Sequence, residues 1–291
     1  MVDRIEEAAA EKAHRFSAWG HKKIWSMLLA DGIQVSQSSV KRAMARRQLL
    51  MPARYQAERR ANAQARKAVF VEPPTRRNRI WQMDFSDFET TAGGNWQICS
   101  LIDYVTKLAF VVQANGTQTG RDAVAGLEAA IAEAEYLLGH SLLQDCTDPV
   151  TKDVHPLVIV TDNGPAFKSD QFAVCIARHQ ELVHVRTRYR APQTNGVVER
   201  FTGSLKYEHL YRIEIQSGHD LAQECEEYRR LYNEVRPHES IGMRTPIAAY
   251  LEPPWGPPTP VKNFRRSATG GLLRVPEPEP QPDPDPVSSR A

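Results

Sequence analysis

The chain has few cysteines and no long hydrophobic run. Its four cysteines, Cys99, Cys146, Cys175 and Cys225, are scattered among 291 residues, and none form a pair with the spacing of zinc ligands. Isolated cysteines of this kind are typical of packed, reduced thiols in a cytosolic protein. No apolar run approaches the roughly 18 residues of a membrane-spanning helix, and acids near the N-terminus argue against a secretory signal. We therefore expect a cytoplasmic protein without membrane contact.

The chain also lacks a strong net charge, but its charges are unevenly distributed. The formal net charge is only +2. Residues 1–80 contain 17 Lys and Arg against 7 Asp and Glu, whereas residues 81–291 contain 20 against 28. A basic N-terminal part on an acidic body favours a polyanion-binding module joined to a second domain. A solvated pair of charged helices is the alternative interpretation.

An unbroken apolar run predicts a buried strand in the middle of the chain. Residues 157–160 read Leu-Val-Ile-Val, which is typical of a strand buried on both faces. The sequence Thr-Asp-Asn-Gly-Pro follows at residues 161–165 and predicts a turn that ends the strand. Asp162 is therefore expected at the carboxyl end of this strand.

A second acid lies within a predicted strand upstream. Residues 80–86 alternate, with Trp81 and Phe85 on the apolar face and polar side chains on the other. Asp84, on the polar face, is unfavourable in a strand, so a functional reason is expected for it. Asp87 is the competing acid, but it falls on the Trp81 face and nearer the following turn.

A third acid is expected on a helix. Glu199 follows Asp162 after 36 intervening residues, and Lys206 lies seven residues beyond Glu199, two helical turns along one face. An acid at a strand end and an acid on a later helix suit a metal-dependent phosphoryl-transfer site. Mg²⁺ prefers oxygen ligands, and two ions about 3.5–4 Å apart can hold the attacking and leaving oxygens of a displacement.

These motifs resemble the catalytic core of DDE transposases and retroviral integrases. The resemblance rests on Thr-Asp-Asn-Gly at residues 161–164, Pro-Gln-Thr-Asn-Gly at 192–196 and Glu-Arg-Phe at 199–201. Their order and spacing are more specific than any one motif, and they suggest the catalytic, orfB-type subunit of bacterial insertion-sequence transposases. The Trp-x-x-Asp pattern of the upstream strand matches the family's first acidic position. The resemblance thus implies, as catalytic and metal-binding residues, Asp84, Asp162 and Glu199.

The resemblance also implies an α/β, ribonuclease H-like fold. We expect a mixed five-stranded sheet with flanking helices, preceded by a small all-α helix-turn-helix domain. The predicted strands are 80–86, 96–103, 108–113, 157–160 and 182–185, and the predicted helices are 120–138, 167–180, a helix from 195, and 223–235. The predicted division is a helix-turn-helix domain, a basic linker, an integrase-like catalytic core with closing helices and a proline-rich disordered tail, at residues 1–50, 51–79, 80–251 and 252–291.

Basic helices near the N-terminus predict contact with DNA. Within residues 11–50, a short helix, a break at Gly32 and a basic second helix from Val40 fit a helix-turn-helix. The segment 19–25 also resembles the small domain that precedes the core in these transposases. A purely structural helical hairpin is the alternative. The residues expected to contact phosphates are Lys22, Lys23, Lys41, Arg42, Arg46 and Arg47.

Further DNA contacts are expected beside the core site. Three arginines alternate around Tyr189, a combination that suits a nucleic-acid backbone and an unstacked base, although a solvated loop is the alternative. Lys206 matches the family's DNA-contacting lysine. The residues assigned to DNA binding in this region are Arg186, Arg188, Arg190, Asn195 and Lys206.

The function implied by the resemblance is DNA transposition, that is, cleavage of insertion-sequence ends and transfer of a 3′-hydroxyl into target DNA. The implied cofactors are two Mg²⁺ ions per site, for which Mn²⁺ can substitute. The implied partners are double-stranded DNA, at least a second copy of the chain on that DNA, and a second small helix-turn-helix subunit, in a nucleoid-associated bacterial protein. A ribonuclease H-like nuclease without strand transfer, and a catalytically inactive transposase-derived DNA-binding protein, are the alternatives.

Three further features are interpreted as structural. Asp103 is expected to cap a strand end. His238 is expected to pack or hydrogen-bond rather than to act as a catalytic base. Residues 139–156 form a polar connection and are predicted to be an exposed insertion. The spacing of their His, Cys and Asp residues fits no zinc-ligand pattern.

Overall fold

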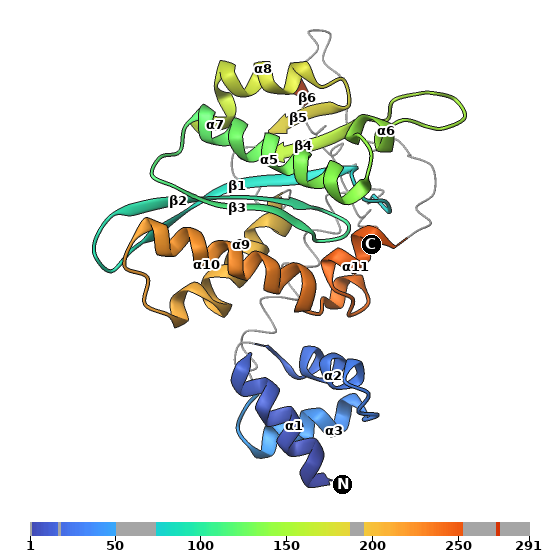
Figure 1. Cartoon of the computed structure of the whole chain (residues 1–291), viewed down its shortest axis with the longest axis vertical. Coiled ribbons are helices and arrows are strands. Elements are labelled where there is room, and N and C mark those ends of the chain that lie inside the picture. Colours follow the sequence, from blue (N-terminus) through green and yellow to red (C-terminus); the bar gives the residue numbers. More distant parts are fainter. Residues whose placement is uncertain (1, 17–18, 51–73, 187–194, 253–271, 274–291) are drawn as a thin grey trace, which may run out of the picture.

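The computed structural model describes residues 2–16, 19–50, 74–186, 195–252 and 272–273. Figure 1 shows a small helical N-terminal unit and a larger unit built on a sheet. Within the described residues, no helix is both long and apolar enough to cross a membrane.

A mixed sheet organises the larger unit. Its strand order is β3-β2-β1-β4-β5-β6, with β2 antiparallel to both β1 and β3, and β4, β5 and β6 parallel to β1. The strands are β1 (Ile80–Glu89), β2 (Asn95–Asp103), β3 (Ala109–Asn115), β4 (Leu157–Thr161), β5 (Leu182–Arg186) and β6 (Leu272–Leu273). The predicted five-stranded mixed sheet is confirmed. Strand β6 is an addition from the predicted disordered tail, whose other residues after 252 lie outside the described ones.

One face of the sheet is covered by α5 (Gly120–Leu138), α7 (Pro165–Lys168) and α8 (Asp170–Arg178) (Figure 1). Trp81, Met83 and Phe85 of β1 all join the hydrophobic cluster on this face, which confirms the predicted alternation. The helix predicted at 167–180 is divided at Ser169, because its hydroxyl accepts a hydrogen bond from Phe172 N and starts a new helix there.

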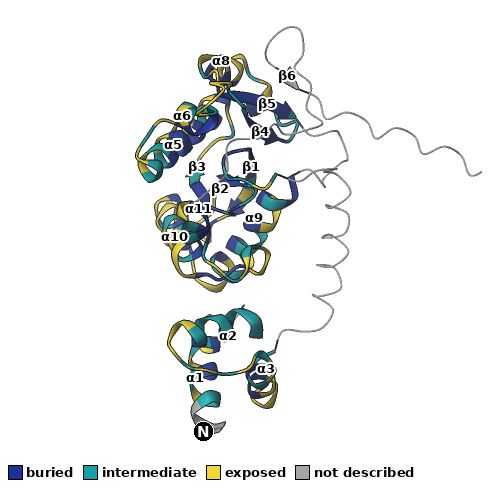
Figure 2. Cartoon of the chain, turned by 90° about the vertical axis from the view of Figure 1, so that its right-hand side faces the viewer, coloured by how far each residue is buried: buried dark blue, intermediate teal, exposed yellow. Residues whose placement is uncertain are grey.

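The closing helices cover the opposite face. They are α9 (Gly196–Glu208), η2 (Leu210–Arg212), α10 (Gly218–Arg230), η3 (Leu231–Val235), η4 (Glu239–Ile241) and α11 (Pro246–Leu251). Val198 and Leu205 of α9 pack with Ile98 and Ile102 of β2 in a second hydrophobic cluster. Figure 2 shows the buried residues concentrated on the sheet and on the helix faces turned toward it.

The core includes two segments that the sequence analysis placed outside it. Asp145, in α6 (Leu142–Cys146), is buried and accepts hydrogen bonds from Arg76 (3.1 Å), Arg77 (3.2 Å) and Asn78 (2.9 Å). The prediction of an exposed insertion at 139–156 is therefore wrong for α6, because its side chains complete a buried polar network. Residues predicted as the end of the linker supply the other half of that network.

The N-terminal unit consists of α1 (Val2–Arg15), α2 (His21–Ala30) and α3 (Gln37–Arg46). Ile24, Leu28, Val40 and Met44 form its hydrophobic cluster together with α1. The two helices and the break expected within residues 11–50 are present, and Ser36 caps α3 through its hydroxyl. Helix α1 begins well before residue 11, where the sequence analysis placed the start of the helical region.

Candidate active site

Asp84 and Asp162 are carried by neighbouring parallel strands. In the pairing of β1 with β4, Gln82 lies opposite Val160. Asp84 is two residues beyond Gln82, and Asp162 is two residues beyond Val160. The register therefore brings the two acids to the same level, with Asp162 directly after the buried strand β4, as predicted.

The turn after β4 holds the Asp162 side chain. Asp162 Oδ1 accepts a hydrogen bond from Gly164 N at 2.8 Å. A Cβ atom at residue 164 would lie 2.9 Å from that same oxygen, closer than carbon and oxygen normally approach. Glycine is therefore required for this carboxylate position, and Pro165 starts α7 directly afterwards.

Helix α9 brings Glu199 and Lys206 to the same face as Asp84. Val198 and Leu205 bury the inner side of the helix, whereas Glu199 is exposed. The Lys206 ammonium donates a hydrogen bond to the backbone oxygen of Asp87 at 2.7 Å. Lys206, seven residues after Glu199 on the same helix, therefore contacts the strand that carries Asp84.

The three acids interact electrostatically. Burial and the negative charge of Asp162 raise the pKa of Asp84 to about 7, with a further contribution from Glu199 and an opposing one from Lys206. The charges of both other carboxylates thus act on Asp84. A divalent cation would remove this repulsion and favour the ionised form of Asp84.

The donor set suits a hard divalent cation. Ser100 lies opposite Asp84 in the β1–β2 pairing, and the hydroxyls of Ser86 and Ser100 are buried without a hydrogen-bond partner among the described residues. Mg²⁺ is usually held by one or two carboxylates together with substrate phosphates. In the described part of the chain, no three His, Cys, Asp or Glu side chains are close enough together to hold a metal ion by themselves. A cation bound beside Asp84 would therefore also need ligands from a substrate or from water.

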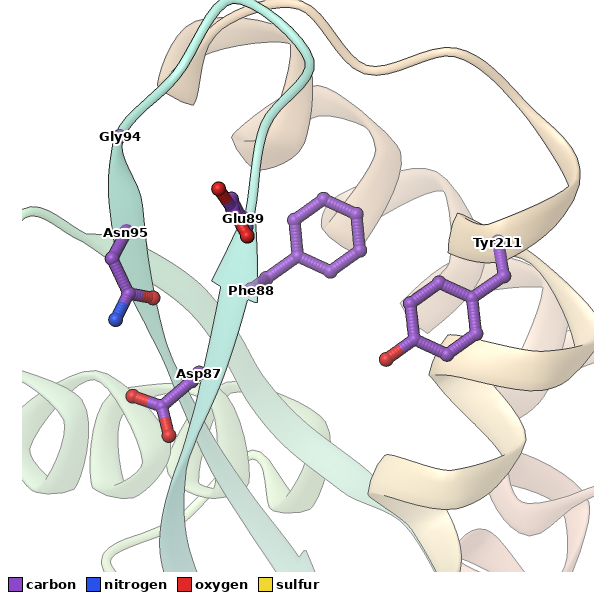
Figure 3. A pocket seen from close by; sticks show the side chains of 6 residues that line it. All are labelled: Asp87, Phe88, Glu89, Gly94, Asn95 and Tyr211. Carbon is purple, nitrogen blue, oxygen red and sulfur yellow. The ribbon is translucent and has the colours of Figure 1, made fainter.

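The competing acid, Asp87, is directed elsewhere. Its carboxylate accepts a hydrogen bond from Gln97. Figure 3 shows Asp87 on the Asn95 side of β1, while the Phe88 ring faces Tyr211. The open pocket in that figure is lined by Asp87, Phe88, Glu89, Gly94, Asn95 and Tyr211, none of which is a proposed metal ligand.

The core residues predicted to contact DNA differ in accessibility. Arg186 ends β5, whereas Arg188 and Arg190 lie outside the described residues. Asn195 is only 4% exposed, because it lies at the start of α9 beneath its first turn. Asn195 is therefore buried in this structure, and its contact with DNA stays a prediction.

The basic residues of α3 also fall into two groups. Lys41 and Arg42 are exposed. Arg46 donates a hydrogen bond from Nε to Glu6 Oε1 at 2.6 Å, and Arg47 lies 3.8 Å from the same carboxylate. The acid of α1 therefore competes with phosphate for Arg46 and Arg47.

Two lysines predicted to contact DNA form ion pairs with the larger unit. Lys23 pairs with Glu208 at 3.2 Å, and Lys22 pairs with Glu239. Trp19 Nε1 also donates to Glu208, at 2.8 Å. No local sequence pattern predicts this contact, because the partners are 189 and 185 residues apart in the chain.

The structural interpretations of Asp103 and His238 are confirmed. Asp103 Oδ1 accepts hydrogen bonds from the amides of Val105 (3.0 Å) and Thr106 (2.7 Å), which caps the end of β2. His238 packs edge-to-face on Tyr232 with ring centroids 4.4 Å apart. Burial and the charge of Arg236 lower the pKa of His238, so its imidazole is a weak proton acceptor.

Comparison with known proteins places the chain in a family. The integrase core domain matches residues 74–191, and a second integrase core domain description matches residues 180–246. The 39.2 kDa protein of insertion element IS476 from Xanthomonas euvesicatoria is 24% identical over 237 residues, which are 81% of this chain and 61% of that protein. Transposase InsD of insertion element IS2 from Escherichia coli is 23% identical over 237 residues, which are 78% of this chain and 72% of InsD.

A solved structure supports the same fold. A chain in the cryo-EM structure of the simian T-cell lymphotropic virus intasome with PP2A regulatory subunit B56 gamma superposes with a TM-score of 0.51 and 18% identity. The superposition covers 88% of this chain and 79% of that one, so the ribonuclease H-like arrangement is shared. The two integrase core matches together extend over more than half of the residues, from 74 to 246, and insertion-element proteins are among the relatives. The chain therefore belongs to the integrase-core family.

Proposed function

We propose that the chain is a DNA transposase that cleaves the ends of its insertion sequence and joins the resulting 3′-hydroxyl to target DNA. The observation that supports this proposal is the effect of Asp162 and Glu199 on Asp84, together with the register that brings Asp84 and Asp162 to one level of the sheet. Transposases of insertion elements are among the relatives, and they support the same class of reaction.

The three carboxylates are the residues that would hold Mg²⁺. Asp84 interacts electrostatically with both Asp162 and Glu199, so a cation beside Asp84 would be attracted by all three negative charges. When bound, the ions would lower the pKa of an attacking water and stabilise the leaving oxygen, and Mn²⁺ is expected to substitute. Gly164 keeps the Asp162 oxygens in place, and the first turn of α9 keeps Glu199 over the strands.

DNA would be held by basic groups on both units. Lys206 lies along β1 beside the acids, and Lys41 and Arg42 are exposed on α3. These cations suit phosphate contacts, which position the duplex without reading its sequence. Because two element ends must meet, the working form would contain at least two copies of the chain on double-stranded DNA. The reaction would take place in the bacterial nucleoid, and a second helix-turn-helix subunit would complete end recognition.

The test is a cleavage and strand-transfer assay on duplexes taken from the DNA that flanks the gene. Wild-type protein, Asp162→Asn and Asp87→Asn would be compared in Mg²⁺ and in Mn²⁺. We expect joined products from the wild type and from Asp87→Asn, and none from Asp162→Asn. The Asp87→Asn control removes a neighbouring acid that is bonded to Gln97 rather than to the site.

Two outcomes would contradict the proposal. Nicking without joining would assign the chain to ribonuclease H-like nucleases. Specific binding without cleavage in either metal would identify an inactive, transposase-derived DNA-binding protein.

A further inference from the structure

Gln82 joins the strand that carries Asp84 to the helix that carries Glu199. Its side chain is 1% exposed. The side-chain oxygen accepts hydrogen bonds from the backbone N–H groups of Val197 at 2.8 Å and Val198 at 3.1 Å. Both amides belong to the first turn of α9, and Glu199 is the next residue along that helix.

This contact replaces the usual cap of a helix. An N-cap side chain normally accepts from the second or third amide of its own helix. Asn195, at the N-cap of α9, makes no such bond, and the second and third amides bond to Gln82 instead. Other helices of the core have local side-chain caps, at Thr119, Ser169 and Ser217. The start of α9 is therefore attached to the sheet rather than to the residue before it.

The strand register makes this attachment relevant to the acids. Gln82 pairs with Val160 across β1 and β4, one side-chain step before the level of Asp84 and Asp162. Side chains two residues apart on a strand share a face, so Gln82 and Asp84 both point toward α9. Because both donors are backbone N–H groups, the oxygen of the amide must face them.

We propose that Gln82 is a positioning residue, which sets the place of Glu199 relative to Asp84 and Asp162 and thereby the strength of divalent-cation binding. This inference rests on the proposed function, because it takes the three carboxylates as the metal ligands. Groups that hold metal ligands in place commonly change metal affinity by about 10–100-fold when they are removed.

Gln82 could also act only by stabilising the fold, and Asn233 provides a matched control for that role. Asn233 is 4% exposed and makes two hydrogen bonds to the backbone of Ala109, one accepted at 3.0 Å and one donated at 2.8 Å. It joins η3 to β3, an edge of the sheet that carries none of the three acids. Loss of its bonds removes a similar buried contact without touching β1 or α9.

The experiment measures Mg²⁺ binding to the full-length chain as the concentration that gives half of the Mg²⁺-induced rise in Tm. The variants are Gln82→Met, which has no acceptor, Gln82→Glu, which keeps one, and Asn233→Leu. We expect Gln82→Met to raise the half-effect concentration about tenfold or more, as for other groups that support metal ligands. We expect Asn233→Leu to lower Tm without changing that concentration, and Gln82→Glu to bind Mg²⁺ at least as tightly as the wild type.

Each contrary result is distinguishable. An unchanged Mg²⁺ response in Gln82→Met, or an equal change in Asn233→Leu, would overturn the positioning role alone. If Gln82→Met does not fold, the test uses Gln82→Glu alone. Weaker Mg²⁺ binding by Gln82→Glu than by the wild type would then overturn the positioning role, because that variant keeps the hydrogen-bond acceptor. A wild type without any Mg²⁺ or Mn²⁺ response would instead refute the proposed metal site, and the role of Gln82 with it.

Discussion

Arg236 donates two hydrogen bonds to the Glu208 carboxylate, from Nε at 2.7 Å and from Nη2 at 2.6 Å. The two side chains are only 8% and 12% exposed. Trp19 and Lys23 of the N-terminal unit bond to the same carboxylate. Glu208 is the last residue of α9, and Glu199 lies in the first turn of the same helix. One helix therefore carries a proposed active-site residue at one end and contacts the N-terminal unit at the other.

Replacement of Glu208 by glutamine should destabilise the protein strongly. The buried Arg236 would lose its counter-charge, and breaking one partner of a buried ion pair typically costs about 3–5 kcal/mol. Urea unfolding would measure this loss. Glu226→Gln is the control, because Glu226 pairs with Arg229 and Arg230 near the surface, where such pairs contribute about 0–1 kcal/mol. Equal losses in both variants would contradict the special role of Glu208.

The same pair should make the protein sensitive to acid. Burial opposes ionisation of Glu208, but the charge and hydrogen bonds of Arg236 outweigh it and lower its pKa from 4.5 to about 2. Because the folded-state pKa is lowered, this stabilisation is present above pH 4.5 and is lost as pH falls toward 2. Unfolding midpoints measured across this range should fall more steeply for the wild type than for Glu208→Gln. Parallel curves would show that Glu208 does not titrate as described.

Gly164→Ala should reduce catalysis far more than stability. The added methyl group would lie 2.9 Å from Asp162 Oδ1, so the carboxylate must move. A misplaced catalytic group of this kind can cost about a hundredfold in rate. The cleavage assay and Tm would be measured together, with Gly203→Ala as the control. A Cβ atom at Gly203, within α9, meets nothing within 4 Å, so that variant should fold at least as stably as the wild type.

His184 should weaken the fold in mild acid. Its Nε2 lies 2.9 Å from Thr161 Oγ1, and burial, with the charge of Arg186, lowers the pKa of His184 from 6.5 to about 4. Because the unfolded chain binds the proton more readily, the free energy of unfolding should decrease as pH falls from 6.5 toward 4. Urea unfolding at pH 7 and pH 5 would show a smaller difference for His184→Gln than for the wild type. An unchanged difference would assign the effect to other groups, such as the buried His238.

The sequence predictions that are confirmed rest on local patterns. The apolar run of β4, the alternation of Trp81, Met83 and Phe85, and the turn at Asp162 each depend on residues close together in the chain. The Asp103 cap is local too, because its amide partners lie two and three residues away. Such features follow from backbone geometry and side-chain periodicity, which a sequence displays directly.

The features that were missed depend on residues far apart. By alternation, Gln82 belongs to a polar face, yet α9 covers it and its oxygen caps that helix from more than a hundred residues away. The α6 segment was predicted to be exposed because it is polar, yet Asp145 is buried against Arg76 and Arg77. Lys23 was assigned to DNA by its charge, but Glu208 lies opposite it in the fold.

The sequence by itself determined the strands, the starts of α5 and α9 and the choice of the three acids as candidates, because each has a local signature or a family motif. Only the tertiary structure decided which polar side chains are buried away from solvent and which groups they hydrogen-bond to. A buried polar group must find a partner wherever the fold places one, and this pairing depends on packing rather than on chain order. The attachment of α9 at both ends, to Gln82 and through Glu208 to Arg236, is therefore a property of the folded chain.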